Sequence, residues 1–290
     1  MKLSLSIRHS LTIATLLVAS AHAACLSDSQ VEALAGHYAA RTLADGVEAL
    51  TEGDGACSRS KFHGHLTRQF GKVIGYKAGL TNPMVQKRFS TDKPVWGRLY
   101  EGMLLPGGSV VDARFGARPL LEADLLVRVK SAEIHRSSTP LQVLAGLDQI
   151  IPFIELPDLV VQDPTKLNGP AISAINVGAR LGVTGEPMAV PESSAERSAL
   201  VDALRDMAVV VSSGDGATLA QGKGADLLEH PLNAVIWLSA ALAMEGIAMQ
   251  PGDLISLGSF SALLPPRAGQ TVTVRYSGVA ALKPVSVGFR

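Results

Sequence analysis

The sequence predicts an α+β fold in which many short strands are accompanied by a few helices. Its 28 glycines and 16 prolines are typical of a turn-rich chain with many strands rather than of a helical bundle. Helical periodicity is confined to a few segments, whereas residues 253–290 form a run of short apolar segments separated by Gly and Pro turns. With 290 residues and 47% hydrophobic content, the chain is long enough to bury a large core.

Residues 1–23 have the pattern of a cleavable signal peptide. Two basic residues precede the short apolar run 11–20, and an Ala-His-Ala cleavage motif ends at Ala23. Because the run is too short to span a bilayer, a transmembrane anchor is the weaker interpretation. We expect cleavage near Ala23, a periplasmic or secreted protein, and no membrane association after signal removal. A lipoprotein anchored through Cys25 is the alternative.

The two cysteines, Cys25 and Cys57, both follow the expected cleavage point. In an oxidising compartment, one disulfide between them is the economical interpretation. It would close a loop of roughly 30 residues and stabilise the fold by about 3 to 4 kcal/mol. Two unpaired thiols are the alternative. Neither cysteine adjoins a motif for nucleophilic catalysis.

Residues 24–69 are predicted to form a small helical segment ahead of the main domain, residues 70–290. Apolar positions at helical spacing predict a first helix over 27–50. The glycine-rich stretch 52–58 is expected to break the helical segment, and a second helix is expected over 62–72.

Within the main domain, three segments have helical character, and one has the pattern of a hairpin. Helices are predicted over 141–149, over 195–207 and within 230–253, where Pro231 is near the start of the last helix and Gly246 ends it. Residues 208–226 alternate about a Gly-Asp-Gly turn and predict a β-hairpin.

Carboxylates in two otherwise apolar strands are the strongest functional signal. Glu122 and Asp124 lie two residues apart in the stretch 121–130, so on a strand both point to the same face. Glu155 occupies a similar apolar setting. Such carboxylates would repel each other and be costly to desolvate, and a hard divalent cation such as Mg²⁺ or Mn²⁺ removes both problems. The alternative is a pair of ordinary carboxylates on the solvent face of an antiparallel strand.

Two further ionisable residues are candidates for the same site. Lys77 interrupts an apolar strand between Gly75 and Gly79, which would let a ligand or backbone approach closely. It could hold an anionic substrate or transfer a proton, whereas the alternative is a strand-end lysine that extends to solvent. Glu101 precedes a glycine and could line a cleft, with an exposed turn carboxylate as the alternative.

Composition and missing motifs exclude several function classes. The 26 Lys plus Arg equal the 26 Asp plus Glu, so no basic excess indicates nucleic acid or an anionic membrane as a partner. Aromatic residues make up only 4%, which also disfavours stacking on single-stranded nucleic acid. The chain has no phosphate-binding loop, no dinucleotide fingerprint after a strand, no nucleophile elbow and no His-Glu-x-x-His motif.

Considered together, these stretches resemble the fumarylacetoacetate hydrolase superfamily, and in particular its 2-keto-4-pentenoate hydratase and 4-oxalocrotonate decarboxylase branch. The resemblance covers residues 70–290. It rests on the stretches GYKAGLTNPMVQKRF, PLLEADLLVRV, IPFIELPDL, HPLNAVIWLSAALAMEGIAMQPGDLISLGSF and RAGQTVTVRYSG. The fold it implies is a mixed β-sheet roll of α+β type, and it also implies assembly into homo-oligomers.

The resemblance also implies roles for single residues. It implies that Glu122, Asp124 and Glu155 are the ligands of Mg²⁺ or Mn²⁺. The lysine of the family's GYK-x-GLT motif is an active-site residue, which corresponds to Lys77 here.

Two more positions match the family motifs with departures. In the family's LxDDM segment, the first Asp corresponds to Glu101 here, and Gly102 replaces the second Asp. The resemblance makes Glu101 a candidate acid or base. The family's Asp-Asn-x-Ser-like stretch matches at Asn176, a candidate substrate contact, whereas Ile175 and Gly178 replace its Asp and Ser.

The activity implied by the resemblance is that of a divalent-metal-dependent lyase. The expected reaction is hydration of a small 2-hydroxy-dienoic or 2-oxo-enoic acid through a metal-stabilised enolate. A 2-oxo acid decarboxylase on the same scaffold is the first alternative, since both reactions share this enolate. An exported binding protein that kept the fold and lost turnover is the second.

Overall fold

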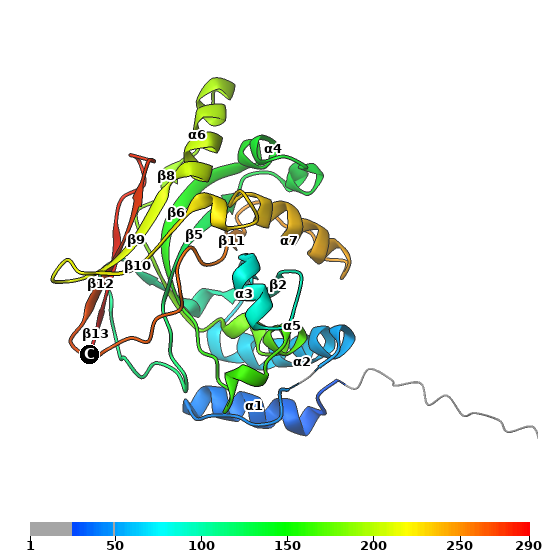
Figure 1. Ribbon diagram of the computed structural model, residues 1–290. Coiled ribbons are helices and arrows are strands. Elements are labelled where there is room, and N and C mark those ends of the chain that lie inside the picture. Colours follow the sequence, from blue (N-terminus) through cyan, green and yellow to red (C-terminus); the bar gives the residue numbers. More distant parts are fainter. Residues whose placement is uncertain (1–24, 49) are drawn as a thin grey trace, which may run out of the picture.

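The computed structural model describes residues 25–48 and 50–290, so the predicted signal peptide lies outside the described residues. Within this part of the chain, two mixed β-sheets pack against each other and helices gather at two ends of the molecule (Figure 1). Helices α1, α2 and α5 lie together at one end, and α4, α6 and α7 lie at the other (Figure 1). The predicted α+β class is confirmed.

The larger sheet has eight strands in the order β2-β1-β11-β5-β6-β7-β3, with β8 paired to β6. Pairs β1/β11 and β3/β7 are parallel and the other pairs are antiparallel. The strands are β1 (Val73–Gly79), β2 (Val95–Tyr100), β3 (Leu104–Pro106), β5 (Glu122–Val129), β6 (Leu147–Leu156), β7 (Leu181–Thr184), β8 (Met188–Ala189) and β11 (Leu254–Ser256). Strand β5 therefore lies in the interior of this sheet.

The smaller sheet has five strands in the order β10-β9-β12-β13-β4. They are β4 (Val110–Val111), β9 (Ala208–Ser213), β10 (Thr218–Lys223), β12 (Thr271–Ser277) and β13 (Val285–Phe289). Strands β9 and β10 pair antiparallel, which confirms the hairpin predicted over 208–226. The strands predicted in the C-terminal tail are present as β11, β12 and β13.

The α-helices are short, apart from α2. They are α1 (Asp28–Ala40), α2 (Glu52–Phe70), α3 (Pro83–Arg88), α4 (Pro140–Ala145), α5 (Gly169–Ala174), α6 (Ser194–Asp206) and α7 (Asn233–Ala243). Single 3₁₀ turns are η1 (Glu101–Met103), η2 (Ala132–Arg136), η3 (Pro164–Lys166), η4 (Asn176–Gly178) and η5 (Gly224–Asp226). Among the described residues, no helix combines the length and the apolar character that crossing a membrane requires.

Two of the three helices predicted in the main domain occur close to their expected positions. Helix α6 matches the prediction over 195–207, and α7 lies in the first part of the stretch 230–253, before the expected end at Gly246. The prediction over 141–149 was too long, because α4 stops at the C-cap Gly146 and the next residues already belong to β6.

The N-terminal helices differ from the predicted boundaries. Helix α1 ends early because its C-cap, Arg41, adopts the left-handed conformation with φ 59°. Helix α2 runs through the glycine-rich stretch that was expected to be a break. Thr51 and Asp54 form a capping box that starts it, and Gly55 lets it approach α5, since a β-carbon there would lie 2.5 Å from the carbonyl oxygen of Pro170.

The segment before α1 is fixed to α2. A disulfide joins Cys25 to Cys57 with a Cα–Cα distance of 5.7 Å, within the usual range for such bonds. The backbone N–H of Leu26 donates to Ser58 Oγ at 3.0 Å. These contacts tie the start of the described chain to the helical layer.

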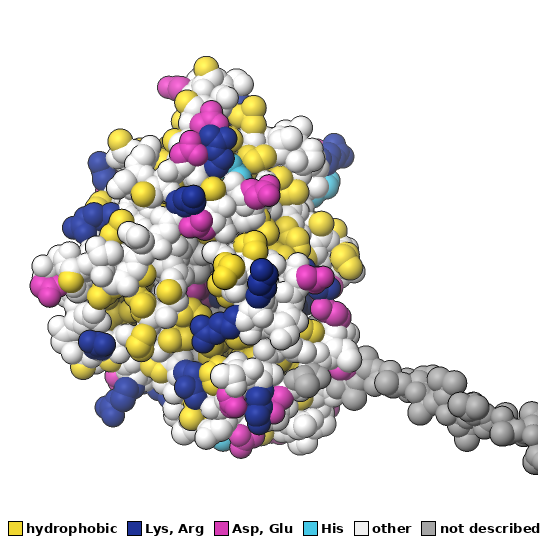
Figure 2. Space-filling view, viewed as in Figure 1, with side chains coloured by type: hydrophobic (Ala, Val, Ile, Leu, Met, Phe, Trp, Pro, Cys, Tyr) yellow, Lys and Arg dark blue, Asp and Glu magenta, His cyan; other side chains and the backbone are white. Residues whose placement is uncertain are grey.

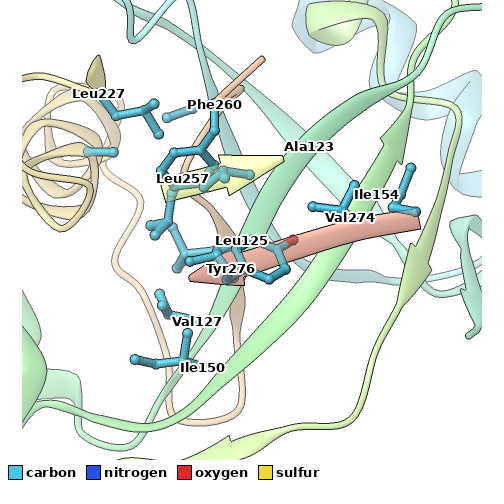
Figure 3. Close-up of a cluster of buried hydrophobic side chains, with 14 of the residues drawn as sticks. Ala123, Leu125, Val127, Ile150, Ile154, Leu227, Leu257, Phe260, Val274 and Tyr276 are labelled. Carbon is cyan, nitrogen blue, oxygen red and sulfur yellow. The ribbon is translucent and has the colours of Figure 1, made fainter. Parts of the chain in front are cut away.

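Apolar side chains of the described residues form two large clusters, and Leu126 of β5 belongs to a smaller third one. One contains residues of both sheets and of α4, α6 and α7, while the other contains residues of α1, α2, α5 and β2. Ala123, Leu125 and Val127 point into the first cluster, close to Val274 and Tyr276 of the smaller sheet (Figure 3). The opposite face of β5 carries Glu122 and Asp124, as alternation along a strand requires.

His230 is a buried polar residue between α6 and α7. Its Nδ1 accepts from the backbone N–H of Leu232 at 3.0 Å, so Nε2 carries the proton and donates to the carbonyl of Val201, also at 3.0 Å. Burial lowers the pKa of His230, with a smaller contribution from Arg205, and the Val201 bond opposes this shift. Protonation of Nδ1 would break the bond to Leu232.

The surface charge is mixed on the face that Figure 2 shows. Basic and acidic side chains are interspersed there, with apolar side chains between them (Figure 2). The expectation that nucleic acid is not a partner stays a prediction.

Candidate active site

Three buried carboxylates lie on one face of the larger sheet. Glu122 and Asp124 are two residues apart on β5, and Glu155 on β6 is paired directly opposite Glu122. Their exposed fractions are 8%, 0% and 2%. The alternative of carboxylates on a solvent-exposed strand face is therefore excluded, because β5 is an interior strand covered on both sides.

Hydrogen bonds hold Asp124 in place. Ser256 Oγ donates to its Oδ2 at 2.5 Å, and the backbone N–H groups of Gly258 and Leu125 donate to Oδ1 at 3.0 and 2.6 Å. Burial raises the pKa of Asp124 to about 8, the charge of Glu155 adds to this rise, and the Ser256 hydrogen bond opposes it. These groups fix the carboxylate orientation without supplying a positive charge.

Lys77 provides the cation beside the carboxylates. It extends from β1 and is 2% exposed, and its ammonium donates to Glu155 Oε1 and, at 3.0 Å, to the carbonyl oxygen of Val177. The alternative of a strand-end lysine extending to solvent is excluded by this burial. Burial raises the pKa of Glu122 well above its usual value, Glu155 adds to the rise, and Lys77 opposes it.

The donor set suits a hard divalent cation in its chemistry. Three carboxylates face a single ammonium, and Glu155 Oε2 is buried without a hydrogen-bond partner among the described residues. Across residues 25–48 and 50–290, however, no three carboxylate, histidine or cysteine side chains are already arranged as a metal site. Binding of a cation therefore requires the carboxylates of Glu122, Asp124 and Glu155 to adjust from the hydrogen bonds described above.

A cavity of about 220 Å³ adjoins this cluster. Lys77 and Glu122 line it, and its other residues come from the end of β1 and the turn after it, from α3, α5 and η4, from the loop after β6, and from the loop after β11. Thr81 and Arg88 are further polar residues of the wall. The arrangement gives a small acid access to a lysine and to a buried carboxylate.

Asn176 does not line the cavity, and its role as a substrate contact stays a prediction. Its side chain is 1% exposed, and its carboxamide bonds the backbone of β2 at Arg98, accepting from the N–H at 2.7 Å and donating to the carbonyl at 2.9 Å. The following residue, Val177, supplies the carbonyl that accepts a hydrogen bond from Lys77. Because the bonds of Asn176 to β2 fix this part of the backbone, Asn176 is a positioning residue for that carbonyl.

Glu101 is also not brought to the cavity, and its role as a candidate acid or base stays a prediction. It is exposed at the start of η1, and its backbone N–H donates to the carbonyl oxygen of Lys72 at 3.0 Å. Its neighbour Tyr100 pairs with Val73, four residues before Lys77 on β1. At about 3.3 Å per residue, this is roughly 13 Å of strand. The exposed position of Glu101 agrees with the alternative, an exposed turn carboxylate.

Sequence reasoning assigned no role to Ser256, Gly258, Thr81 or Arg88. A serine inside the apolar stretch LISLGSF was the available signal for Ser256, because a buried hydroxyl requires a polar partner. Gly258 has a φ of +102°, a backbone conformation that favours glycine, and this explains why a glycine stands at this position. The sequence carried no comparable signal for Arg88, which has an ordinary surface-helix pattern around it.

Comparison with known proteins decides the family. No family model matches the chain. The chain is 30% identical to a 4-oxalocrotonate decarboxylase of Pseudomonas putida over 211 residues, which cover 73% of this chain and 76% of the relative. A 2-keto-4-pentenoate hydratase of Burkholderia vietnamiensis is 27% identical over 219 residues, covering 73% and 77%. The chain belongs to the 4-oxalocrotonate decarboxylase and 2-keto-4-pentenoate hydratase family.

Solved structures agree with this family membership. The 4-oxalocrotonate decarboxylase from Pseudomonas putida G7, complexed with magnesium and adipate, superposes with a TM-score of 0.77 and 27% identity, covering 91% of this chain and 99% of that one. Fumarylpyruvate hydrolase from Pseudomonas aeruginosa, at 13% identity and a TM-score of 0.52 over 76% of this chain and 90% of its own, shows the same fold. The predicted branch of the fumarylacetoacetate hydrolase superfamily is confirmed.

Proposed function

We propose that this member of the family is a divalent-metal-dependent lyase that hydrates a small 2-hydroxy-dienoic or 2-oxo-enoic acid. The observation that carries the proposal is the group of three buried carboxylates, which share one face with Lys77 beside a small cavity. The names of the family relatives support lyase chemistry, and the magnesium in the Pseudomonas putida G7 structure supports a divalent cation.

Glu122, Asp124 and Glu155 are the residues that would hold Mg²⁺ or Mn²⁺. Oxygen-only donors match the preference of these hard cations. When bound, the cation supplies Lewis acidity toward the 2-oxo group of the substrate. The hydrogen bonds from Ser256 and Gly258 would orient Asp124 for this role, as partners of metal-bound carboxylates do.

Lys77 is the residue of the cavity wall that would contact the substrate at this end. Its ammonium is shielded from solvent, so its attraction to a substrate carboxylate is stronger than that of an exposed lysine. The Val177 carbonyl, positioned through Asn176, keeps the ammonium at the cavity wall. Lys77 would thus bind the carboxylate of the substrate and is the candidate for proton transfer.

Decarboxylation of a 2-oxo acid is the second candidate reaction. It is favoured by the relatives with 30% and 31% identity, both of which are named 4-oxalocrotonate decarboxylase. The carboxylate cluster would serve both reactions, since each develops negative charge on the same keto oxygen.

The test is a turnover assay on the mature protein with Mg²⁺ and then with EDTA. Loss of ultraviolet absorbance is followed with 2-hydroxypenta-2,4-dienoate and with its carboxylated homologue 4-oxalocrotonate. We expect chelator-sensitive turnover of at least one substrate, and mass spectrometry of the product distinguishes addition of water from loss of carbon dioxide. Absence of turnover with both substrates would contradict the proposal and favour an exported binding protein.

We further propose that the protein acts in the periplasm or outside the cell as a homo-oligomer. The signal-peptide pattern of residues 1–23 supports export, and the family resemblance supports assembly. N-terminal sequencing of the protein from separated cell fractions tests the first statement, with a mature chain that begins near Ala24 as the expected result. Light scattering of the purified chain tests the second.

A further inference from the structure

Three consecutive residues beside Lys77 adopt the left-handed backbone conformation. Asn176, Val177 and Gly178 have φ of 53°, 55° and 65°, and together they form the turn η4. Glycine adopts this region without steric conflict, whereas a β-branched residue is poorly suited to it. Among the described residues with positive φ, Val177 is the only β-branched one. Its backbone is therefore strained and has to be held by contacts from outside the turn.

Strands β1 and β2 supply these contacts. The carboxamide of Asn176 bonds the backbone at Arg98 on both sides, at 2.7 and 2.9 Å. Two glycines leave the space that the turn occupies. A β-carbon on Gly79 would collide with Cγ1 of Val177, and one on Gly97 would lie 2.7 Å from the carbonyl oxygen of Asn176. The branched side chain of Val177 therefore rests directly on the backbone of β1, two residues after the active-site lysine.

The same turn presents two groups to the active site. The carbonyl oxygen of Val177 accepts from Nζ of Lys77 at 3.0 Å, and the side chain of Val177, which is 7% exposed, lines the cavity. The other partner of the ammonium is Glu155. Because an ammonium has three N–H groups, these two acceptors fix the direction of the third. A glycine at position 177 would allow backbone conformations in which the carbonyl turns away from Lys77.

We propose that Val177 is a positioning residue, whose branched side chain packs on Gly79 and keeps its own carbonyl turned toward Lys77. The remaining N–H of the ammonium is thereby directed at the carboxylate of the substrate. For the backbone conformation alone, glycine would suit position 177 better, and the valine instead restricts the carbonyl to one orientation. The inference rests on the proposed function, since it assumes that Lys77 binds the substrate carboxylate.

The test is titration calorimetry of the purified protein in Mg²⁺ with oxalate, an unreactive anion that resembles the carboxylate and keto oxygens of a 2-oxo acid. Val177→Gly should bind oxalate about 10-fold more weakly than the wild type, because a hydrogen bond to a charged group is no longer held in place. Val177→Thr keeps the branched β-carbon and should stay within about twofold of the wild type.

Val161→Gly is the matched control for the loss of a buried valine. Val161 is 3% exposed, belongs to the same apolar cluster as Val177, does not line the cavity, and has a φ outside the left-handed region. This control should bind oxalate as the wild type does. Both glycine variants lose a buried side chain, but only Val177→Gly releases left-handed strain. It should therefore melt roughly 2–8 °C above Val161→Gly.

A double-mutant cycle with Lys77→Met distinguishes positioning from a general structural effect. Oxalate also contacts the bound cation, so its affinity stays measurable without Lys77. If Val177 acts through Lys77, adding Val177→Gly to Lys77→Met should weaken oxalate binding by less than about twofold further. A purely structural role of Val177 would instead give the same 10-fold loss in both backgrounds.

The outcomes that overturn the inference differ from those that overturn the proposed function. Oxalate binding that is equal in the wild type and Val177→Gly would reject the role of Val177 alone, and so would a 10-fold loss that persists in Lys77→Met. A melting temperature of Val177→Gly below that of Val161→Gly would reject the strain on which the argument depends. Absence of both oxalate binding and turnover in the wild type would reject the proposed function as well.

Discussion

Replacing Lys77 with methionine tests whether one ammonium balances the buried carboxylates. The side chains of Lys77 and Glu155 are 3% and 2% exposed, so this ion pair is shielded from water. The substitution keeps a similar length and removes the charge. Glu155 would then be buried without its cation, opposite Glu122 and close to Asp124.

The expected loss of stability is large because the pair is buried. Removal of one partner of a buried ion pair lowers the free energy of unfolding by about 3–5 kcal/mol, compared with about 0–1 kcal/mol for an exposed pair. At about 2–4 °C per kcal/mol for a chain of this size class, the melting temperature in EDTA should fall by roughly 6–20 °C. A divalent cation replaces the missing charge, so Mg²⁺ or Mn²⁺ should stabilise the variant more than the wild type.

The assay is thermal unfolding followed by circular dichroism, in EDTA and in Mn²⁺. Lys93→Met is the matched control, because Lys93 pairs with Glu52 at 3.2 Å while both side chains are exposed, at 52% and 65%. It should change the free energy of unfolding by no more than about 1 kcal/mol. A Lys77→Met protein as stable as the wild type in EDTA would refute the reasoning, as would equal stabilisation of both by Mn²⁺.

Three further predictions follow from other contacts. Ser256→Ala removes the hydrogen bond to Asp124 and should weaken Mn²⁺ binding by about 10- to 100-fold in a calorimetric titration, with the fold retained. Because burial lowers the pKa of His230 below its value in the unfolded chain, the unfolded state binds more protons in acid, and stability should fall as the pH drops below about 6.5. His230→Gln should flatten this dependence in urea unfolding. The Cys25–Cys57 bond closes a separation of 32 residues, so reduction should lower the free energy of unfolding by about 3–4 kcal/mol, and mass spectrometry finding both thiols free in the protein purified without reductant would contradict the bond.

Local patterns in the sequence were sufficient to predict the carboxylate strand. Alternation along β5 placed Glu122 and Asp124 on one face, and the structure confirms this. The pairing of Glu155 with Glu122 depends on the register between two strands, which periodicity does not specify. The reach of Lys77 from β1 to Glu155 also depends on the order of the strands, in which β11 and β5 intervene.

Contacts between distant segments account for the places where the structure differs from the expectations. The start of α2 contains two glycines, Gly53 and Gly55, which disfavour a helix, but a capping box starts the helix and Gly55 allows its close approach to Pro170. Asn176 matched a family motif, yet its carboxamide is used by the backbone at Arg98. Glu101 matched a motif as well, but the register of β1 and β2 places it away from the cavity.

The most direct test of the central claim is a titration of the purified protein with Mn²⁺, followed by electron paramagnetic resonance of the free ion. The wild type should bind one ion tightly, and Glu122→Gln, Asp124→Asn and Glu155→Gln should each weaken binding by more than about tenfold, with Glu192→Gln, an exposed carboxylate, as the unaffected control. Binding that is unchanged in all three variants, or absent in the wild type, would contradict the assignment of these carboxylates as the metal site.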